Sequence, residues 1–244
     1  MTDAPAPPPA PEDFDAVGLA KTLLREIRAA TLATLTETGA PFATLTALAT
    51  DHEGAPILLM SRLAQHTRHL EHDPRLSLLL ARGGGGDPLA HPRLTLAGSA
   101  RRDANPRLRA RYLSRNPKAA LYADFADFSF WRVEVDSAFL NGGFGRAAQL
   151  SAAELLTPLA EAERLLSAEE EILGRLNAHE GKALARLAGA RDGAAKWRAS
   201  GLDPEGLDLV SGDLCRRVAF GRPVGSPAAL AEAFAELVKD VPAR

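Results

Sequence analysis

The alternation of apolar and polar residues predicts that the first part of the chain is mainly β-structure. Six segments have apolar residues at alternate positions or form short runs that are apolar throughout. Turn-forming Gly and Pro residues lie between the first two, so these are expected to form an antiparallel hairpin. The predicted strands are residues 31–36, 42–50, 57–60, 75–81, 93–103 and 128–140.

Helical periodicity and capping residues predict the elements around these strands. Residues 14–30 have apolar side chains on one side, with Arg25 among the polar residues on the other. A short helix is expected after the third strand, and it should end at Asp73 because a residue that precedes proline disfavours the helical conformation. The Asn-Pro pairs at 105–106 and 116–117 each predict the start of a further helix.

A second, smaller unit is predicted beyond residue 150. The segments 151–154 and 167–170 both fit the capping box, and the second is expected to begin a helix over about 168–188. Three short strands at 197–201, 207–210 and 214–220 follow, and Ser-Pro then precedes a last helix at 228–239. The expected domains are a disordered tail rich in Pro and Ala at 1–13, a first domain at 14–150 and a small C-terminal α/β domain at 151–244.

Composition narrows the class of protein. The 244 residues are 46% hydrophobic and 25% charged, and 29 basic against 31 acidic residues give a net charge of -2, so neither nucleic-acid nor membrane binding is expected. The single cysteine, Cys215, excludes an internal disulfide and a multi-cysteine metal site, and it favours a cytoplasmic location. His66, His69 and His72 are three residues apart on one helix and cannot all reach one metal ion, so no metal site is expected.

The end of the third strand carries the most informative polar residues. Ser61 and Arg62 lie just before the short helix, whose free N-terminal amides favour an anion. Gln65, His66 and Arg68 on that helix add side-chain donors. Two interpretations follow from these residues alone, a phosphate-binding site or a helix cap with solvated arginines.

Residues 61–79 match a pattern of the form Ser-Arg-Leu-Ala-x-His-Thr-x-x-Leu-x-x-Asp-Pro-Arg-x-Ser-Leu-Leu. With the order of elements, this resembles the HugZ-type haem-utilisation branch of the pyridoxamine phosphate oxidase superfamily. The resemblance implies an α+β fold, an antiparallel split β-barrel of the FMN-binding type with peripheral helices, followed by a small helix-sheet-helix domain. It also implies a homodimer with the cofactor site at the subunit interface.

The resemblance assigns positions to the cofactor, which would be FMN or, alternatively, haem. The second strand would lie along the flavin through Thr44, Leu45, Thr46 and Ala47. Met60, Ser61, Gln65 and His66 would approach the phosphate, with Arg62 and Arg68 as compensating cations. Arg146, in a Gly-Phe-Gly-Arg-Ala segment that resembles one near the family's dimer interface, would be a ligand-facing or a buried structural cation.

The same segment, residues 143–148, also fits the dinucleotide fingerprint G-x-G-x-x-A. No strand-helix-strand unit surrounds it, so the match is interpreted as accidental.

Departures from the resemblance leave three functions open. Pyridoxamine phosphate oxidases have cations at the positions of Thr44, Ala49, Gln65 and His66, and each lost charge removes about 1.5 to 3 kcal/mol of hydrogen bonding to phosphate. That activity is therefore not expected. The alternatives are a flavin-dependent oxidoreductase of unassigned substrate, a haem-binding or haem-degrading protein, and a cofactor-free regulatory protein. The C-terminal histidine of haem-degrading relatives is absent, which leaves His179, a barrel histidine or an oxygen atom as the haem ligand.

Overall fold

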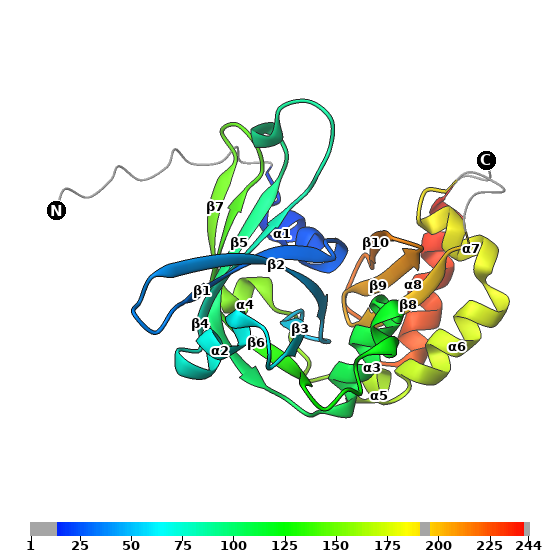
Figure 1. The fold of residues 1–244 in the computed structure, drawn as a ribbon. Coiled ribbons are helices and arrows are strands. Elements are labelled where there is room, and N and C mark those ends of the chain that lie inside the picture. Colours follow the sequence, from blue (N-terminus) through cyan, green and yellow to red (C-terminus); the bar gives the residue numbers. More distant parts are fainter. Residues whose placement is uncertain (1–13, 191–195, 242–244) are drawn as a thin grey trace.

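The computed structural model describes residues 14–190 and 196–241, and its largest element is a seven-stranded antiparallel sheet (Figure 1). The strand order is β3-β2-β1-β4-β5-β6-β7, and β3 also pairs with β6. The first six strands therefore close into a barrel, and β7 extends the sheet beyond β6. The strands are β1 Ala29–Leu35, β2 Pro41–Thr50, β3 Pro56–Ser61, β4 Arg75–Ala81, β5 Arg93–Arg102, β6 Phe128–Asn141 and β7 Ala147–Ser151.

Helices surround the barrel, and a second sheet with its own helices packs beside it (Figure 1). The barrel helices are α1 Ala16–Glu26, α2 Gln65–His72, α3 Pro106–Arg115 and α4 Ala152–Leu155, with 3-10 turns η1 Pro88–Ala90 and η2 Pro117–Leu121. The second sheet has the order β10-β9-β8, with β8 Arg198–Asp203, β9 Gly206–Ser211 and β10 Leu214–Ala219. Its helices are α5 Glu163–Ser167, α6 Glu169–His179, α7 Gly181–Leu187 and α8 Pro227–Asp240.

Alternating side chains from the strands fill the barrel. Leu32, Leu48, Leu78 and Leu96 are fully buried in one apolar core to which α1 also contributes. At Gly98 the pairing of β5 with β6 shifts by one residue, and a Cβ atom there would lie 2.1 Å from the carbonyl oxygen of Glu134. Only glycine fits this close approach of two backbones. The predicted α+β split barrel is confirmed.

Several local predictions were wrong. The first helix ends at Glu26 because the residues from Ala29 on pair with β2. The long helix predicted from 168 is broken into α6 and α7, and Ser167 does not cap it, since its N-cap Ala168 has no side-chain hydrogen bond. The helix after Asn116 is a single 3-10 turn, and β7 was not predicted.

Arg25 was expected on the polar side of the first helix, but it is buried between the two sheets. Its guanidinium lies 3.1 Å from Asp203, which is 0% exposed and also forms two 2.7 Å hydrogen bonds with Arg217. Arg111 on α3 donates to the carbonyl oxygen of Thr50 at 3.0 Å and to Glu169 at 2.5 Å. These buried ion pairs connect the barrel and its helices to β8, β9 and α6.

Membrane binding and the domain boundary are the two expectations that concern the chain as a whole. Across residues 14–190 and 196–241, none of the helices has the length and apolar character that crossing a membrane requires. The expected domain boundary near residue 150 stays a prediction, and the expected tail at 1–13 lies outside the described residues.

Candidate functional site

The candidate site is the opening where β2 and β3 diverge. Only three residue pairs, from Leu48↔Leu58 to Thr50↔Pro56, join these strands. Beyond them, β3 pairs with β6 while the first part of β2 pairs with β1 alone. Helix α2 follows β3 directly and packs against β1. The segments of β2, β3 and α2 that carry the predicted residues therefore lie around the same opening of the barrel.

The four predicted residues of β2 do not share one orientation. Leu45 is 73% exposed and Ala47 is also exposed, so these two project from the outer face of the sheet. Thr46 is buried and donates a 3.3 Å hydrogen bond to the carbonyl oxygen of Ala47, whereas Thr44 is half-buried. Since side chains alternate along a strand, a planar ligand on either face would meet at most two of the four.

Met60 and Ser61, the predicted phosphate contacts on β3, are already engaged. The side chain of Met60 is buried in the barrel core. The Ser61 hydroxyl donates a 2.5 Å hydrogen bond to the Asp127 carboxylate and accepts one of 3.1 Å from the backbone N–H of Leu63. Asp127 was not predicted, because it reaches Ser61 only through the pairing of β3 with β6. A negative charge therefore lies where the phosphate was expected.

Helix α2 presents free donors instead of a capped end. Its N-cap residue is Ala64, which provides no side-chain hydrogen bond to the first-turn amides. The side chains of Arg62, Gln65 and Arg68 are exposed. In the part of the chain that the structure describes, neither arginine side chain has an ion-pair partner. Burial lowers the pKa of the half-buried His66, and the nearby His69 lowers it further.

A hollow of about 370 Å³ lies between α2 and the hairpin that joins β1 to β2. Its lining includes Phe42, Arg68 and His69. The imidazole of His69 shares a 3.0 Å hydrogen bond between Nδ1 and the Thr34 hydroxyl, and the ring of Phe42 meets it edge-on with centroids 5.1 Å apart. Among the described residues, Nε2 of His69 has no hydrogen-bond partner. His69 was predicted only as part of a solvated helix face, since its contact with Thr34 is not visible in the sequence.

Exposed apolar side chains lie beside Ser61. Phe128, the β6 partner of Ser61, contacts Tyr122 and Phe125 with ring centroids 5.0 and 6.4 Å away. Leu121 is 79% exposed and Phe125 58% exposed, and Leu63 at the start of α2 is also exposed. This apolar patch, formed by Leu63, Leu121, Tyr122, Phe125 and Phe128, adjoins Arg62, which precedes α2.

Arg146 does not join this site within one chain. It lies in the turn between β6 and β7, where its guanidinium stacks over the Phe14 ring at 5.9 Å. With Arg93 and the exposed Phe144 it lines a separate hollow of about 260 Å³. The same turn contains the dinucleotide-like sequence, and because it joins two antiparallel strands, it cannot serve as a strand-to-helix phosphate loop.

Two residues considered as ligands lie elsewhere. His179 is exposed at the end of α6, a helix that lies on the opposite side of the molecule from α2 (Figure 1). Cys215 is buried in β10, and burial raises the pKa of its thiol, as expected for a small core residue.

The closed six-stranded barrel with an opening between β2 and β3 defines a split-barrel protein of the FMN-binding, pyridoxamine phosphate oxidase-related type. The family described as CREG, beta-barrel matches residues 11–156. The chain belongs to this CREG β-barrel family and is related to the HugZ-type proteins within the split-barrel fold.

Individual relatives agree with this assignment. The non-canonical heme oxygenase HOZ of Arabidopsis thaliana chloroplasts is 39% identical over 119 residues, which are 43% of this chain and 36% of that protein. The chain thus spans about a third of the length of this curated relative. A protein of unknown function from Agrobacterium tumefaciens is 37% identical, with a TM-score of 0.82 over 96% of this chain and 99% of its own. A heme binding protein from Mycobacterium smegmatis is 32% identical, with a TM-score of 0.55 over 93% and 98%.

Proposed function

We propose that this protein binds haem at the opening bordered by β2, β3 and α2. The relatives from Arabidopsis and Mycobacterium, whose names refer to haem, support this choice of ligand. The proposal is limited to haem binding, because haem degradation needs further catalytic groups and we assign none to the residues at this opening. Of the functions that the sequence leaves open, we therefore favour haem binding over flavin-dependent oxidation.

The position of Asp127 is the observation that carries the proposal. An FMN phosphate at Ser61 would come close to the Asp127 carboxylate, which accepts the Ser61 hydroxyl at 2.5 Å. Two like charges about 4 Å apart repel by roughly 4 kcal/mol near a protein surface. Haem has no phosphate, and its two carboxylates lie together at one edge of a large apolar plane, so it does not require an anion at this position.

The residues around the opening fit a ligand of this kind. The apolar patch offers contact area to a porphyrin. Arg62 and Arg68, which have no ion-pair partner among the described residues, offer charge-assisted hydrogen bonds to its propionates. When bound, haem supplies iron for one-electron and dioxygen chemistry. The protein's part is to hold the plane, neutralise its carboxylates and limit access of water.

His69 is the candidate iron ligand. A ligating histidine needs one free ring nitrogen, and the hydrogen bond of its other nitrogen fixes the ring orientation. His69 meets both conditions, because Thr34 holds Nδ1 and Nε2 is free among the described residues. Arg68, one residue before it, lines the same hollow and is placed to bind a carboxylate.

We expect the purified protein to retain hemin after desalting. The variant His69→Ala should shift the Soret band and lower the affinity for hemin at least about tenfold. His72→Ala is the matched control, since His72 lies on the same helix and is exposed. It should leave both the band and the affinity unchanged. Absorption spectra and hemin titrations measure these effects. Hemin that passes through the desalting column would contradict the proposal, and an unchanged spectrum of His69→Ala would exclude His69 as ligand.

The second candidate is an FMN-dependent oxidoreductase. The N-terminus of α2 favours it, because the first backbone amides of this helix have no side-chain cap and can donate hydrogen bonds to a phosphate. The same desalting assay with FMN separates the two. Wild-type protein that keeps FMN and not hemin would establish the second candidate. Retention of FMN by Asp127→Asn alone would show that the carboxylate excludes the phosphate. If no variant binds either pigment, the cofactor-free alternative stands.

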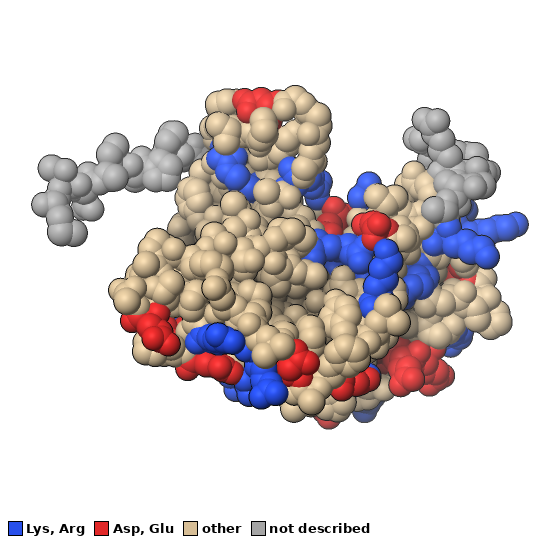
Figure 2. All heavy atoms as spheres, in the orientation of Figure 1, with Lys and Arg blue, Asp and Glu red and all other residues tan. Residues whose placement is uncertain are grey.

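We further propose that the protein is a homodimer formed through the outer face of the barrel sheet. Two rows of side chains cross six strands of this face without one charged residue. Figure 2 shows few charged side chains over β1 and β2. A face of this kind is self-complementary about a two-fold axis. The rows are Leu45, Thr31, Leu79, Thr95, Phe139 and Gln149, and Ala43, Ala33, Ser77, Ala97, Ser137 and Ser151.

Leu79→Arg is expected to convert the dimer to a monomer, because two arginines would meet near the centre of an apolar interface. Leu214→Arg, an exposed leucine on β10 outside this face, is the control and should stay dimeric. Size-exclusion chromatography with light scattering should give twice 25.9 kDa for wild type and control, and 25.9 kDa for Leu79→Arg. A monomeric wild type would end the model of a site shared between subunits.

A further inference from the structure

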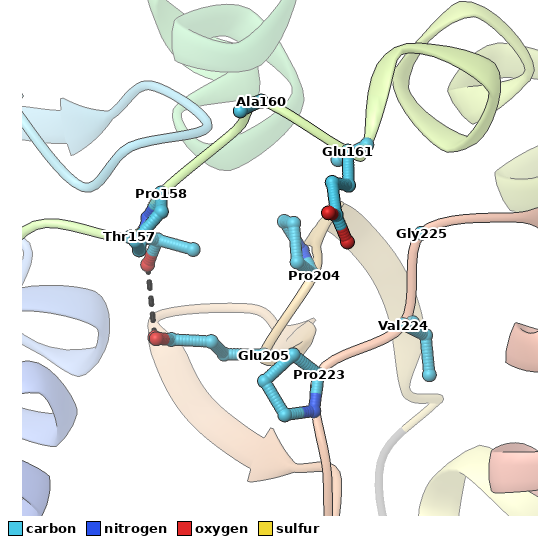
Figure 3. A pocket seen from close by; sticks show the side chains of 10 residues that line it. Thr157, Pro158, Ala160, Glu161, Pro204, Glu205, Pro223, Val224 and Gly225 are labelled. Carbon is cyan, nitrogen blue, oxygen red and sulfur yellow. Dashed lines mark hydrogen bonds between the residues drawn. The ribbon is translucent and has the colours of Figure 1, made fainter.

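A hollow of about 410 Å³ lies away from the proposed haem site. Three segments distant in sequence surround it, as Figure 3 shows: residues 157–162 after α4, the turn Pro204-Glu205 between β8 and β9, and residues 223–225 before α8. Its volume lies within the range of small-molecule sites in proteins. None of the functions considered above uses it.

Hydrogen bonds hold these segments together, so the hollow is preformed. The Thr157 hydroxyl donates to Glu205 at 2.9 Å, and the backbone N–H of Val224 donates to the carbonyl oxygen of Pro204 at 2.8 Å. Gly225 packs so tightly against residues 157–162 that a Cβ atom would lie 2.5 Å from the carbonyl oxygen of Glu161. A ligand would therefore enter without a large cost of ordering the walls.

The walls are apolar, but the hollow carries negative charge. Pro158, Pro204, Pro223 and Val224 supply rigid hydrocarbon surface, and the side chain of Glu161 extends into the space between them (Figure 3).

The two carboxylates at the hollow differ in their partners. Glu205 is neutralised by Lys21, whose ammonium lies 2.6 Å from one carboxylate oxygen. Glu161 has neither an ion pair nor a side-chain hydrogen bond within the part of the chain that the structure describes. The hollow thus offers one uncompensated carboxylate beside apolar walls.

We propose that this hollow binds an organic cation, a guanidinium or alkylammonium group carried on a short apolar stem. The carboxylate of Glu161 pairs with the cation, and the proline rings pack against the stem. Ca²⁺ and Mg²⁺ do not fit, because they need six or more oxygen ligands and, among the described residues that line the hollow, Glu161 supplies the one unpaired carboxylate. An anionic or strongly polar ligand does not fit the walls.

The test uses n-butylguanidinium as probe and its neutral isostere n-butylurea, titrated into the full-length protein and followed by NMR chemical-shift changes. Butylguanidinium should bind saturably, with shifts confined to the three segments and an affinity typical of a small fragment. Butylurea and the variant Glu161→Gln should each weaken binding at least about tenfold, the loss of one charge-assisted contact. Glu163→Gln, a neighbouring exposed carboxylate outside the lining, is the control and should bind as wild type does.

A second arm separates a small-molecule guanidinium from an arginine side chain of a protein, with the peptide acetyl-Ala-Arg-Ala-amide as probe. Binding of butylguanidinium with exclusion of the peptide assigns a small-molecule site, and binding of both assigns a site that also accepts an arginine of a partner. Equal affinity for butylurea, undiminished binding by Glu161→Gln, or no saturation up to about 50 mM would each overturn the proposal.

Discussion

Replacing Asp203 by alanine is expected to lower the free energy of unfolding by about 3 to 5 kcal/mol, the range found when one partner of a buried ion pair is removed. Asp203 is fully buried, and it lies between Arg25 and Arg217. Burial by itself raises the pKa of this carboxyl, but the two guanidinium charges outweigh it and lower the pKa far below its usual range. Alanine would leave both arginines buried beside a cavity.

The fluorescence of the two tryptophans allows the loss of stability to be measured separately in the barrel and around the second sheet. Trp131 lies in the barrel on β6, and Trp197 packs in the core around the second sheet. Urea unfolding of Trp131→Phe and Trp197→Phe backgrounds should show that Asp203→Ala shifts both signals, because Arg25 belongs to α1 on the barrel and Asp203 to β8. Asp213→Ala is the control. Its side chain is 87% exposed in its pair with Arg28, so a change below about 1 kcal/mol is expected. A similarly small change for Asp203→Ala would show that the cluster does not fasten the two sheets.

Local signals in the sequence were sufficient for most of the elements. Asn105 caps α3 through a hydrogen bond to the Arg107 amide, and Ser226 caps α8 in the same way through Ala229. The capping box at Ser151 is present in both directions. Each of these depends on residues within four positions of one another, and such contacts are determined by the chain's own short-range geometry.

Long-range contacts were not accessible in this way. The Ser61–Asp127 hydrogen bond spans 66 residues and depends on the closure of the barrel by β3 and β6. No local pattern specifies that pairing. The sequence therefore predicted a bound phosphate at Ser61, where the fold brings the Asp127 carboxylate. The same limit explains Arg25, whose position on a helix indicates the polar side but does not reveal that a second sheet covers that side.

The resemblance to split-barrel proteins predicted that the strands close into a barrel, but it could not predict which ligand the barrel binds. Family patterns place Ser61 and α2 at the cofactor, and the barrel opening brings β2, β3 and α2 together as implied. The choice between FMN and haem depends on the charge around Ser61, where this chain has the Asp127 carboxylate. Such residues have to be read from the structure of the individual chain.

Acid is expected to weaken the attachment of α6 to the barrel through Glu169. This carboxylate is the first residue of α6, and it accepts hydrogen bonds from Arg111 at 2.5 Å, from His52 at 2.7 Å and from the Leu202 amide at 3.0 Å. Burial by itself raises the pKa of Glu169, but the Arg111 charge and the His52 and Leu202 contacts lower it from 4.5 to about 2. A difference of this size corresponds to roughly 3 kcal/mol of stability above the unfolded-state pKa.

Because the folded-state pKa is depressed, this stability is fully present above about pH 4.5 and is lost as the pH falls toward 2. We expect the stability difference between wild type and Glu169→Gln, measured by urea unfolding, to be largest near neutral pH and to shrink through this window. Glu170→Gln, the exposed neighbour, should parallel the wild type at every pH. Asp203 also loses stability as the pH falls below the ordinary pKa of an aspartate, because its own pKa is lowered in the folded protein, but it is present in both proteins and cancels from their difference. A difference between wild type and Glu169→Gln that stays constant on acidification would mean that the pKa of Glu169 is not lowered in the folded protein, so that its contacts with Arg111, His52 and Leu202 give no net preference for the ionised form.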